Sequence, residues 1–272
     1  MSLPISETIR YRRSVRSFDG TPLMENDKKA LLAFAASVST PYGMAIEWQL
    51  LDAKALGLGS PVITGEDTYI AGKMKKAPHA EEAFGFAFER ILLHAAAEGI
   101  GSTMIAGTMD RKAFERAIGL QADEVMPCVS PLGYPASRMS LRESLMRKGI
   151  KADTRLPFEE LFYRGDWSTP LYPEGIGTLG KVLELVRLAP SAVNKQPWRI
   201  LVTEQGAHFY EKPGKGYKSA DGWDIQKIDM GIALCHFDLG MEEYGLPCRF
   251  SLEDPGLPHP EELSYIASYL LA

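Results

Sequence analysis

Apolar positions alternate between helical and strand spacing along the first half of the chain and predict its secondary structure. A short helix is expected near the N-terminus from Ser6, and a second helix is capped by Asn26 or Asp27. The segment EEAFGFAFERILLHAAAEGIG (81–101) is apolar on nearly every face, which predicts a buried central helix, and Asp110 caps a later one. Short strands are expected at 46–53, 68–73, 102–107 and 125–134. A polar, basic stretch follows at 137–155.

The pattern begins again after residue 156. FDGTPLMENDKKALLAFAAS (18–37) is echoed by DWSTPLYPEGIGTLGKVLELVRLAPS (166–191), and the helix ending in AAAEGIG is echoed by DMGIALCHFDLGMEEYGLP (229–247). Each half is predicted to run helix, strand, long apolar helix, strand, which indicates an internal duplication, although two loose matches can also arise by chance. We expect a first half at 1–160 and a second at 161–272, intertwined as one globular unit.

Composition narrows the class of protein. The 272 residues are 45% hydrophobic and 24% charged with a net charge of −5, which is typical of an ordered globular chain without a basic surface for nucleic acid. The three cysteines show no metal-binding spacing, so free thiols in a reducing compartment and no metal site are expected. Because neither a signal core nor a run of 18 apolar residues is present, we expect a cytoplasmic protein without a membrane partner.

The segment RYRRSVRSF (10–18) places four arginines within seven residues of an acidic protein. Such a cluster is a local feature, and local cationic clusters bind local anions. The simpler interpretation is a solvated basic helix end that is favoured by the helix macrodipole. The sequence of this segment alone leaves both interpretations open.

A second motif, APSAVNKQPW (189–198), follows an apolar helix and leads into the strand RILVTE (199–204). Pro190 ends the helix, and Ser191 and Asn194 place short hydrogen-bonding groups in the loop. These groups suit the rim of a planar ring that is rich in heteroatoms. They also suit a simple turn in which Ser and Asn bond to their own backbone.

Together, RRSVRSF and PSAVNKQPW resemble the two hallmark segments of the nitroreductase family of FMN-dependent oxidoreductases. Further matches follow in the family order, namely AAAEGIGSTMIAGTMD, KAFERAIGL, SPLGYP and RLPFEEL. The resemblance covers nearly the whole chain. It implies an α+β class and a three-layer α/β/α fold with mostly antiparallel sheets packed with helices.

The arginine motif stands only in the first half and PSAVNKQPW only in the second, so the chain looks like the fused subgroup in which one chain imitates the family homodimer as an internal pseudo-dimer. In that dimer the two motifs meet across the flavin. The resemblance therefore implies one complete site with one FMN per chain, and an opposite site, FYRGDWS (162–168) facing STPYGM (39–44), that has lost its ligands. Fusion removes the need to dimerise, which makes a monomer plausible.

The resemblance also assigns residues. Arg12, Ser14 and Arg16 would contact the phosphate, ribityl chain or pyrimidine edge, with Arg13 near them. Arg155 would be a second phosphate clamp, and Lys151 is a weaker candidate, since Asp153 stands where a lysine is usual. The ring would be lined by Pro190, Ser191, Ala192, Asn194 and, less securely, Gln196, while Ala106 and Gly107 match the turn at flavin N5. Many family members carry Glu at the position of Ala106.

No side chain is assigned to proton transfer, because the flavin itself carries the hydride. The scattered histidines, including His94 and His236, and the thiol of Cys235 are expected to be structural. The Gly- and Lys-rich segment EKPGKGYKSADGW (211–223) is expected to be a mobile loop near the site.

The resemblance implies an FMN-dependent oxidoreductase that moves hydride from NAD(P)H to a small electron-poor acceptor, a nitroaromatic, a quinone or a related compound, in a ping-pong cycle. One alternative is a flavin-binding or flavin-free ligand-binding protein without turnover. Another is specialised flavin chemistry, such as dehalogenation or flavin fragmentation, which requires insertions that the sequence does not reveal.

Overall fold

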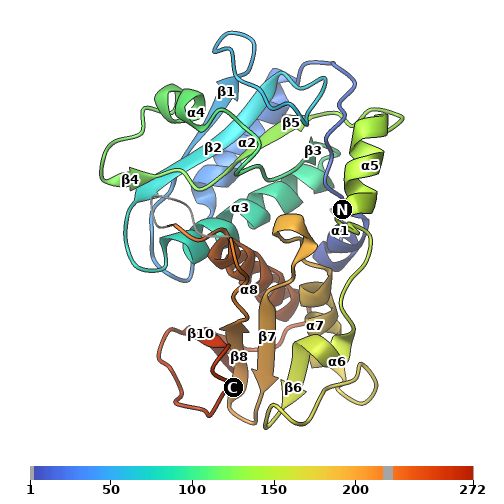
Figure 1. Ribbon diagram of the computed structural model, residues 1–272, viewed down its shortest axis with the longest axis vertical. Helices are drawn as coiled ribbons and strands as arrows, with labels where there is room; N and C mark the ends of the chain where they lie inside the picture. The colour runs from blue at the N-terminus through green and yellow to red at the C-terminus, as the bar shows by residue number, and fades with distance from the viewer. Residues whose placement is uncertain (1–2, 217–222, 272) are drawn as a thin grey trace.

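The computed structural model describes residues 3–216 and 223–271 of the chain and contains two β-sheets separated by long helices (Figure 1). The first sheet contains β1 (Glu47–Asp52), β2 (Thr68–Lys75), β5 (Val129–Gly133) and β3 (Gly101–Ser102), in that order, with β4 (Glu124–Val125) paired to β2. The second contains β6 (Phe162–Arg164), β7 (Trp198–Val202), β8 (Gly206–Glu211), β10 (Ser264–Leu271) and β9 (Cys248–Ser251). Most pairs are antiparallel, so the α+β class with mostly antiparallel sheets is confirmed.

Helices pack on both sheets and between them. The two longest are α3 (Ala80–Ala97) and α8 (Ile225–Glu243), and they lie against each other between the sheets (Figure 1). The others are α1 (Ile5–Tyr11), α2 (Glu25–Ser37), α4 (Arg111–Ala117), α5 (Leu141–Gly149), α6 (Phe158–Leu161), α7 (Thr178–Leu188) and a 3₁₀ turn, η1 (Ala192–Asn194).

The two halves share a topology. Within each sheet four strands follow the same order, β1-β2-β5-β3 in the first and β7-β8-β10-β9 in the second. In each half the long helix follows the second of these strands, and a shorter helix, α2 or α7, precedes the first. The predicted succession of helix, strand, long apolar helix and strand is therefore present twice. β6 is the exception, because it joins the second sheet parallel to β7.

Glycines allow the backbones of α3 and α8 to touch. A Cβ atom on Gly85 would lie 2.1 Å from the carbonyl oxygen of Ile228, and one on Gly231 would lie 2.0 Å from the carbonyl oxygen of Glu82. Each glycine thus meets the residue three positions before the other glycine, which is the reciprocal pattern of a two-fold interface. The apolar surface of α3 is buried on nearly all sides, so the predicted central helix is confirmed.

Helix starts were predicted with mixed success. The side chain of Asp110 does cap α4, since it accepts a hydrogen bond from the Ala113 N–H at 3.1 Å. The prediction of Asn26 or Asp27 as a cap is wrong, because α2 begins at Glu25 without a side-chain cap. Asp27 instead accepts a hydrogen bond from the Tyr134 hydroxyl at 2.6 Å.

The strand boundaries also differ from the prediction. Of 102–107 only Ser102 belongs to a strand, and the segment 125–134 splits around Pro127, which has no N–H to donate to a ladder. The basic stretch contains α5, whose N-terminal Ser140 accepts a hydrogen bond from the Glu143 N–H at 3.1 Å. Within the described residues no helix is long and apolar enough to cross a membrane.

Candidate functional site

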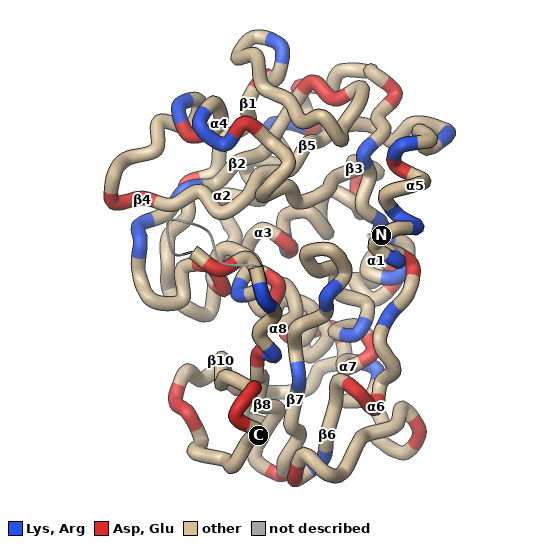
Figure 2. Tube along the Cα trace, viewed as in Figure 1, with Lys and Arg blue, Asp and Glu red and all other residues tan. Residues whose placement is uncertain are grey.

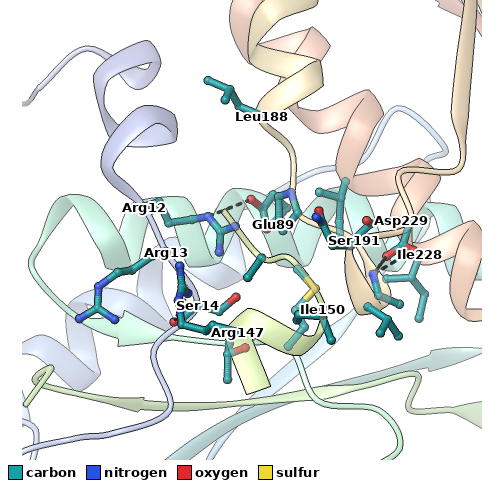
Figure 3. Close-up of a pocket in the computed structure, with 18 of the residues that line it drawn as sticks. Arg12, Arg13, Ser14, Glu89, Arg147, Ile150, Leu188, Ser191, Ile228 and Asp229 are labelled. Carbon is teal, nitrogen blue, oxygen red and sulfur yellow. Dashed lines mark hydrogen bonds and ion pairs between the residues drawn. The ribbon is translucent and has the colours of Figure 1, made fainter. Parts of the chain in front are cut away.

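A cavity of about 320 Å³ lies at the junction of the two halves (Figure 3). Its walls come from the segment after α1, from α3 and α5, and from the end of α7, the η1 loop and α8. Of the twelve residues predicted from sequence, ten line it: Arg12, Arg13, Ser14, Arg16, Ala106, Arg155, Pro190, Ser191, Ala192 and Asn194. Gly107 and Gln196 are not among its lining residues.

The arginine run reaches the cavity because α1 ends before it. The chain leaves the helix at Arg12 and becomes extended, with Ser14 bridging Ser102 of β3 and the Val15 N–H donating to the Ser102 carbonyl at 2.9 Å. Side chains two positions apart in extended backbone point to the same side. Arg12, Ser14 and Arg16 therefore face the cavity together, while Val15 is buried in the core behind them.

Positive charge dominates this end of the cavity, and Figure 2 shows basic residues at α1 and α5. Arg13 lies 3.6 Å from a carboxylate oxygen of Glu143, and Arg147 forms an ion pair with Asp153. The Nη1 atom of Arg16 is buried and has no hydrogen-bond partner in the part of the chain that the structure describes. Burial lowers the pKa of Arg16, and Glu143 opposes that shift. A buried guanidinium with a free donor is suited to receive an anionic ligand.

The facing loop has a strained backbone. Val193, Asn194 and Gln196 have positive φ angles of 50°, 58° and 50°, a region that residues other than glycine rarely adopt. Hydrogen bonds hold this conformation: the Gln196 N–H donates to the Ser191 hydroxyl at 2.8 Å, and the Ala192 N–H donates to both oxygens of Asp229 at 2.9 and 3.1 Å. Strain of this kind is concentrated at functional sites.

Two residues that the sequence predicts to contact the flavin ring make structural hydrogen bonds that hold the loop. The Asn194 amide donates to the carbonyls of Lys151 and Thr154 at 2.7 and 3.0 Å. Gln196 is buried, and its side-chain oxygen accepts a hydrogen bond from the Leu156 N–H at 2.9 Å. Both side chains thus tie the loop to the segment 151–156, whereas the simpler interpretation expected Ser and Asn to bond to their own backbone; within the described residues, only the Ser191 hydroxyl bonds within the loop in this way.

Arg155 lines the cavity but fastens the segment before α6 to the loop. Its guanidinium donates to the carbonyls of Ala152, Thr154 and Leu188 at 3.0, 2.9 and 3.0 Å. Burial, reinforced by Arg12 and Arg187, lowers the pKa of Arg155 to about 10. Its role as a second phosphate clamp stays a prediction.

Sequence reasoning missed several cavity residues, among them the ionisable Glu89, Cys128, Arg147 and Asp229. Glu89 and Asp229 are buried, one on each long helix. The available signal was weak: each is one of several ionisable residues on a largely buried helix, and such residues are rarely buried unless they are paired or functional. Arg147 and Cys128 carry no comparable signal in the sequence.

Glu89 is bonded to His236, which the sequence analysis expected to be structural. The Nδ1 atom of His236 lies 2.8 Å from the Leu185 carbonyl, which can only accept, so Nδ1 carries a proton. The Nε2 atom lies 2.9 Å from Glu89 Oε1, and this contact requires a second proton on one of the two groups. The buried pair therefore holds a shared proton beside Arg12, whose Nε lies 3.8 Å from Glu89.

The second position, where FYRGDWS was expected to face STPYGM, has a different arrangement in the structure. FYRGDWS does not face STPYGM: Phe162–Arg164 form β6 beside β7, and Tyr163 packs on Trp167. Tyr42 instead contacts the rings of Phe250 and His79, with centroids 5.0 and 5.8 Å apart. The pairing of β6 with β7 holds FYRGDWS at the second sheet and away from this position. Of the predicted loop at 211–223, residues 217–222 lie outside the described residues.

Comparisons with known proteins agree with this architecture. The chain matches the family model described as "Putative TM nitroreductase" over residues 4–241. It is similar to a structure from Thermotoga maritima described as a "putative nitroreductase", with 22% identity and a TM-score of 0.66 over 100% of this chain and 95% of that chain, which shows a shared fold. An FMN-dependent nitroreductase from Clostridium difficile is similar over 49% of this chain and 88% of that one, with 17% identity and a TM-score of 0.43. No curated protein matches the sequence.

Proposed function

The chain belongs to the TM nitroreductase family of oxidoreductases, and from this membership we propose that it is an FMN-dependent enzyme that takes hydride from NAD(P)H and passes it to an electron-poor acceptor. Nitroaromatics and quinones are the acceptor classes that the family resemblance suggests. The observation that carries the proposal is the buried Nη1 atom of Arg16, which bonds to none of the described residues, within an arginine-lined cavity.

The donor set suits the phosphate of FMN. A phosphate monoester carries about 1.5 to 2 negative charges near neutral pH. Arg12, Arg13 and Arg16 offer permanently charged donors, and arginine binds phosphate in a bidentate manner. Ser14 adds a hydroxyl within the same run. These residues would hold the phosphate, and the loop at 190–194 would lie against the ring.

The remaining contribution of the chain is orientation and exclusion of water. FMN, when bound, supplies the hydride chemistry. Ile9, Ile228 and Ile232 give the cavity an apolar wall that excludes solvent from this chemistry. The Arg111 guanidinium donates to the Ala106 carbonyl at 2.9 Å and so fixes the turn that the family places at the reactive edge of the ring.

We further propose that the chain is an internal pseudo-dimer with one FMN site, as the family resemblance implies. The shared strand order and the reciprocal glycine contacts of Gly85 and Gly231 support this proposal. The arginine run stands only at the start of the first half, and the rings of Tyr42 and Phe250 occupy the opposite position. A monomer would then contain a complete site.

A visible spectrum and an FMN titration test the proposed function. Purified protein should show flavin absorption, bind one FMN per chain and lose its yellow colour under anaerobic NADH or NADPH. A colourless protein that takes up no FMN would refute flavin binding. Two FMN molecules per chain would contradict the single site, and bound FMN that neither donor reduces would favour a binding protein without turnover.

A further inference from the structure

Asp229 is a buried acid in the wall of the cavity. Its side chain lies on α8 with the residue only 3% exposed, and Figure 3 shows it at the end of the cavity away from Arg13. Ile225 and Ile228 of the same helix line the cavity beside it. Two apolar side chains thus flank this buried acid in the cavity wall.

The hydrogen bonding of Asp229 suits a carboxylic acid better than a carboxylate. Within the described residues, both of its oxygens receive their hydrogen bond from one donor, the Ala192 N–H, at 2.9 and 3.1 Å. An ionised carboxylate offers about four acceptor positions, so one shared N–H leaves most of them unsatisfied. Burying an ionised group in this way is costly, and the group binds a proton instead.

The neighbouring charges act in the same direction. Burial raises the pKa of Asp229 well above its usual value of 3.8, the acids Glu211 of β8 and Asp224 at the start of α8 raise it further, and only the Ala192 N–H opposes them. The Cys128 thiol faces the same place, and its pKa is raised as well, although Arg111 opposes that shift. The other charged residues that line the cavity are Arg10, Arg12, Arg13, Arg16, Glu89, Arg147, Asp153 and Arg155.

We propose that Asp229 is the proton donor of this site and that its carboxylic acid protonates the acceptor bound beside it, an inference that rests on the proposed function. Reducing a quinone by two electrons adds one hydride and one proton. The hydride electrons originate from NAD(P)H. The O–H bond of Asp229 breaks as an O–H bond forms on the quinone oxygen, and water then reprotonates the carboxylate.

Two other buried groups are less suited to this role. The proton of the Glu89 and His236 pair is held in the contact between their side chains, at 2.9 Å. Cys128 is a thiol, a much weaker acid than a carboxylic acid even when exposed, and burial raises its pKa further, so it gives up its proton poorly. Asp229 combines a cavity position with an acid proton that no side-chain partner shares within the described residues.

The variant Asp229→Asn separates proton donation from loop support. The asparagine oxygen can still accept from Ala192, and its NH₂ group replaces the acid O–H without a transferable proton. General acid catalysis contributes roughly 10²- to 10⁴-fold, so reduction of 1,4-benzoquinone by the FMN-loaded variant should slow by about 100-fold. Reduction of ferricyanide, which takes electrons without a proton, should remain within about twofold because it needs no acid.

The pH dependence and solvent isotope effect complete the kinetic test. In the native protein the quinone rate should fall as pH rises through the pKa of Asp229 and should show a solvent deuterium isotope effect. Both features should disappear in the variant. Equal losses with quinone and ferricyanide would show that Asp229 only supports the loop, and unchanged rates with both would show that water supplies the proton. Either result overturns the proposal.

A second measurement needs neither FMN nor turnover. The infrared spectrum of the native protein without FMN should contain, at neutral pH, a protonated carboxylic C=O band that Asp229→Asn lacks. An acid with a raised native pKa binds its proton more tightly when folded, so the free energy of unfolding falls as pH rises from about 4. Asp229→Asn should lack this fall. An ionised Asp229 at neutral pH would overturn the proposal, even if FMN binding also failed.

Discussion

Two loops occupy the same place in the two halves and have opposite fates. The loop at 189–197 connects α7 to β7, and the loop at 38–46 connects α2 to β1. The first faces an arginine run across a cavity, whereas in the second the ring of Tyr42 packs on aromatic neighbours. The fold is common to both positions. The loop at 189–197 faces arginines that remain available to a ligand. At the loop at 38–46, aromatic rings fill the corresponding space.

The backbone differs as well. The cavity loop holds three residues other than glycine at positive φ, while in the described structure of 38–46 only Gly43 has a positive φ, of 67°. A left-handed residue other than glycine costs about 1 to 3 kcal/mol and persists only where its surroundings enforce it. Hydrogen bonds that the loop donates to the Ser191 hydroxyl, the Asp229 carboxyl group and the Lys151 carbonyl provide that enforcement. Of the two loops, only the one that faces the arginines holds residues other than glycine in this conformation, within the described residues.

The largest effect on stability is expected at the crossing of α3 and α8, a feature that the two halves share and in which the two loops do not differ. In Gly231→Ala the new Cβ would lie 2.0 Å from the Glu82 carbonyl oxygen, so α3 and α8 must separate. We expect a loss on the order of 3 kcal/mol in the free energy of unfolding. Urea denaturation measures it, with Gly59→Ala as the control, since a Cβ there meets nothing within 4 Å. Equal stability of the two variants would show that the halves are not locked at this crossing.

Arg16→Ala tests the charged side of the comparison. Removing a charge-assisted hydrogen bond should weaken FMN binding by about 1.5 to 3 kcal/mol, or roughly 10- to 150-fold in Kd. Fluorescence titration with FMN gives the Kd. Arg249→Ala is the matched control, because Arg249 is an exposed arginine on β9 in the other half, and its loss should leave the Kd unchanged. An unaltered Kd in Arg16→Ala would show that the arginine run serves another purpose.

Tyr42→Phe tests the position that aromatic rings fill, and it has the smallest expected effect on stability. Its hydroxyl is buried and, among the residues that the structure describes, has no hydrogen-bond partner. Removing it should leave the free energy of unfolding unchanged or raise it by up to about 1 kcal/mol. Tyr134→Phe is the control, and it should lose about 1 kcal/mol because its hydroxyl donates to Asp27. If Tyr42→Phe destabilised the protein as much as Tyr134→Phe does, the filled position would contain a polar contact of its own.

Much of this architecture could be predicted from local sequence. The apolar residues around the whole of 81–101 indicated a central helix, and the repeated pattern indicated two similar halves. The start of α2 could not be predicted, because Asp27 has the composition of a cap but bonds to Tyr134, which lies far along the chain. A strand after α8 was expected only as the last element of the repeated pattern, without bounds, because the pairing partners of β9 and β10, not their own pattern, define these strands.

The residues of the site could likewise be predicted only in part. The two motifs indicated which segments meet, because each carries its own chemistry in sequence. Asp229 and Glu89 were missed, since their importance arises from burial at the contact of two helices, which a linear pattern does not display. The structural hydrogen bonds of Arg155 and Asn194 could not be predicted for the same reason, because the carbonyls that accept them come close only in the folded chain.

The N-terminal helix has a consequence for biosynthesis. The Ser6 N–H donates to a carboxylate oxygen of Glu243 at 2.8 Å, across 237 residues, and Ile9 packs into the core formed mainly by the second half. A ribosome therefore produces the arginine run early, but the helix before it, α1, packs on α3, α7 and α8 and lacks part of its support until α8 has emerged. Contacts of such long range form late and slowly. Chains interrupted before α8 should thus expose a cationic segment that only the first half anchors, and anion binding becomes a property of nearly finished molecules.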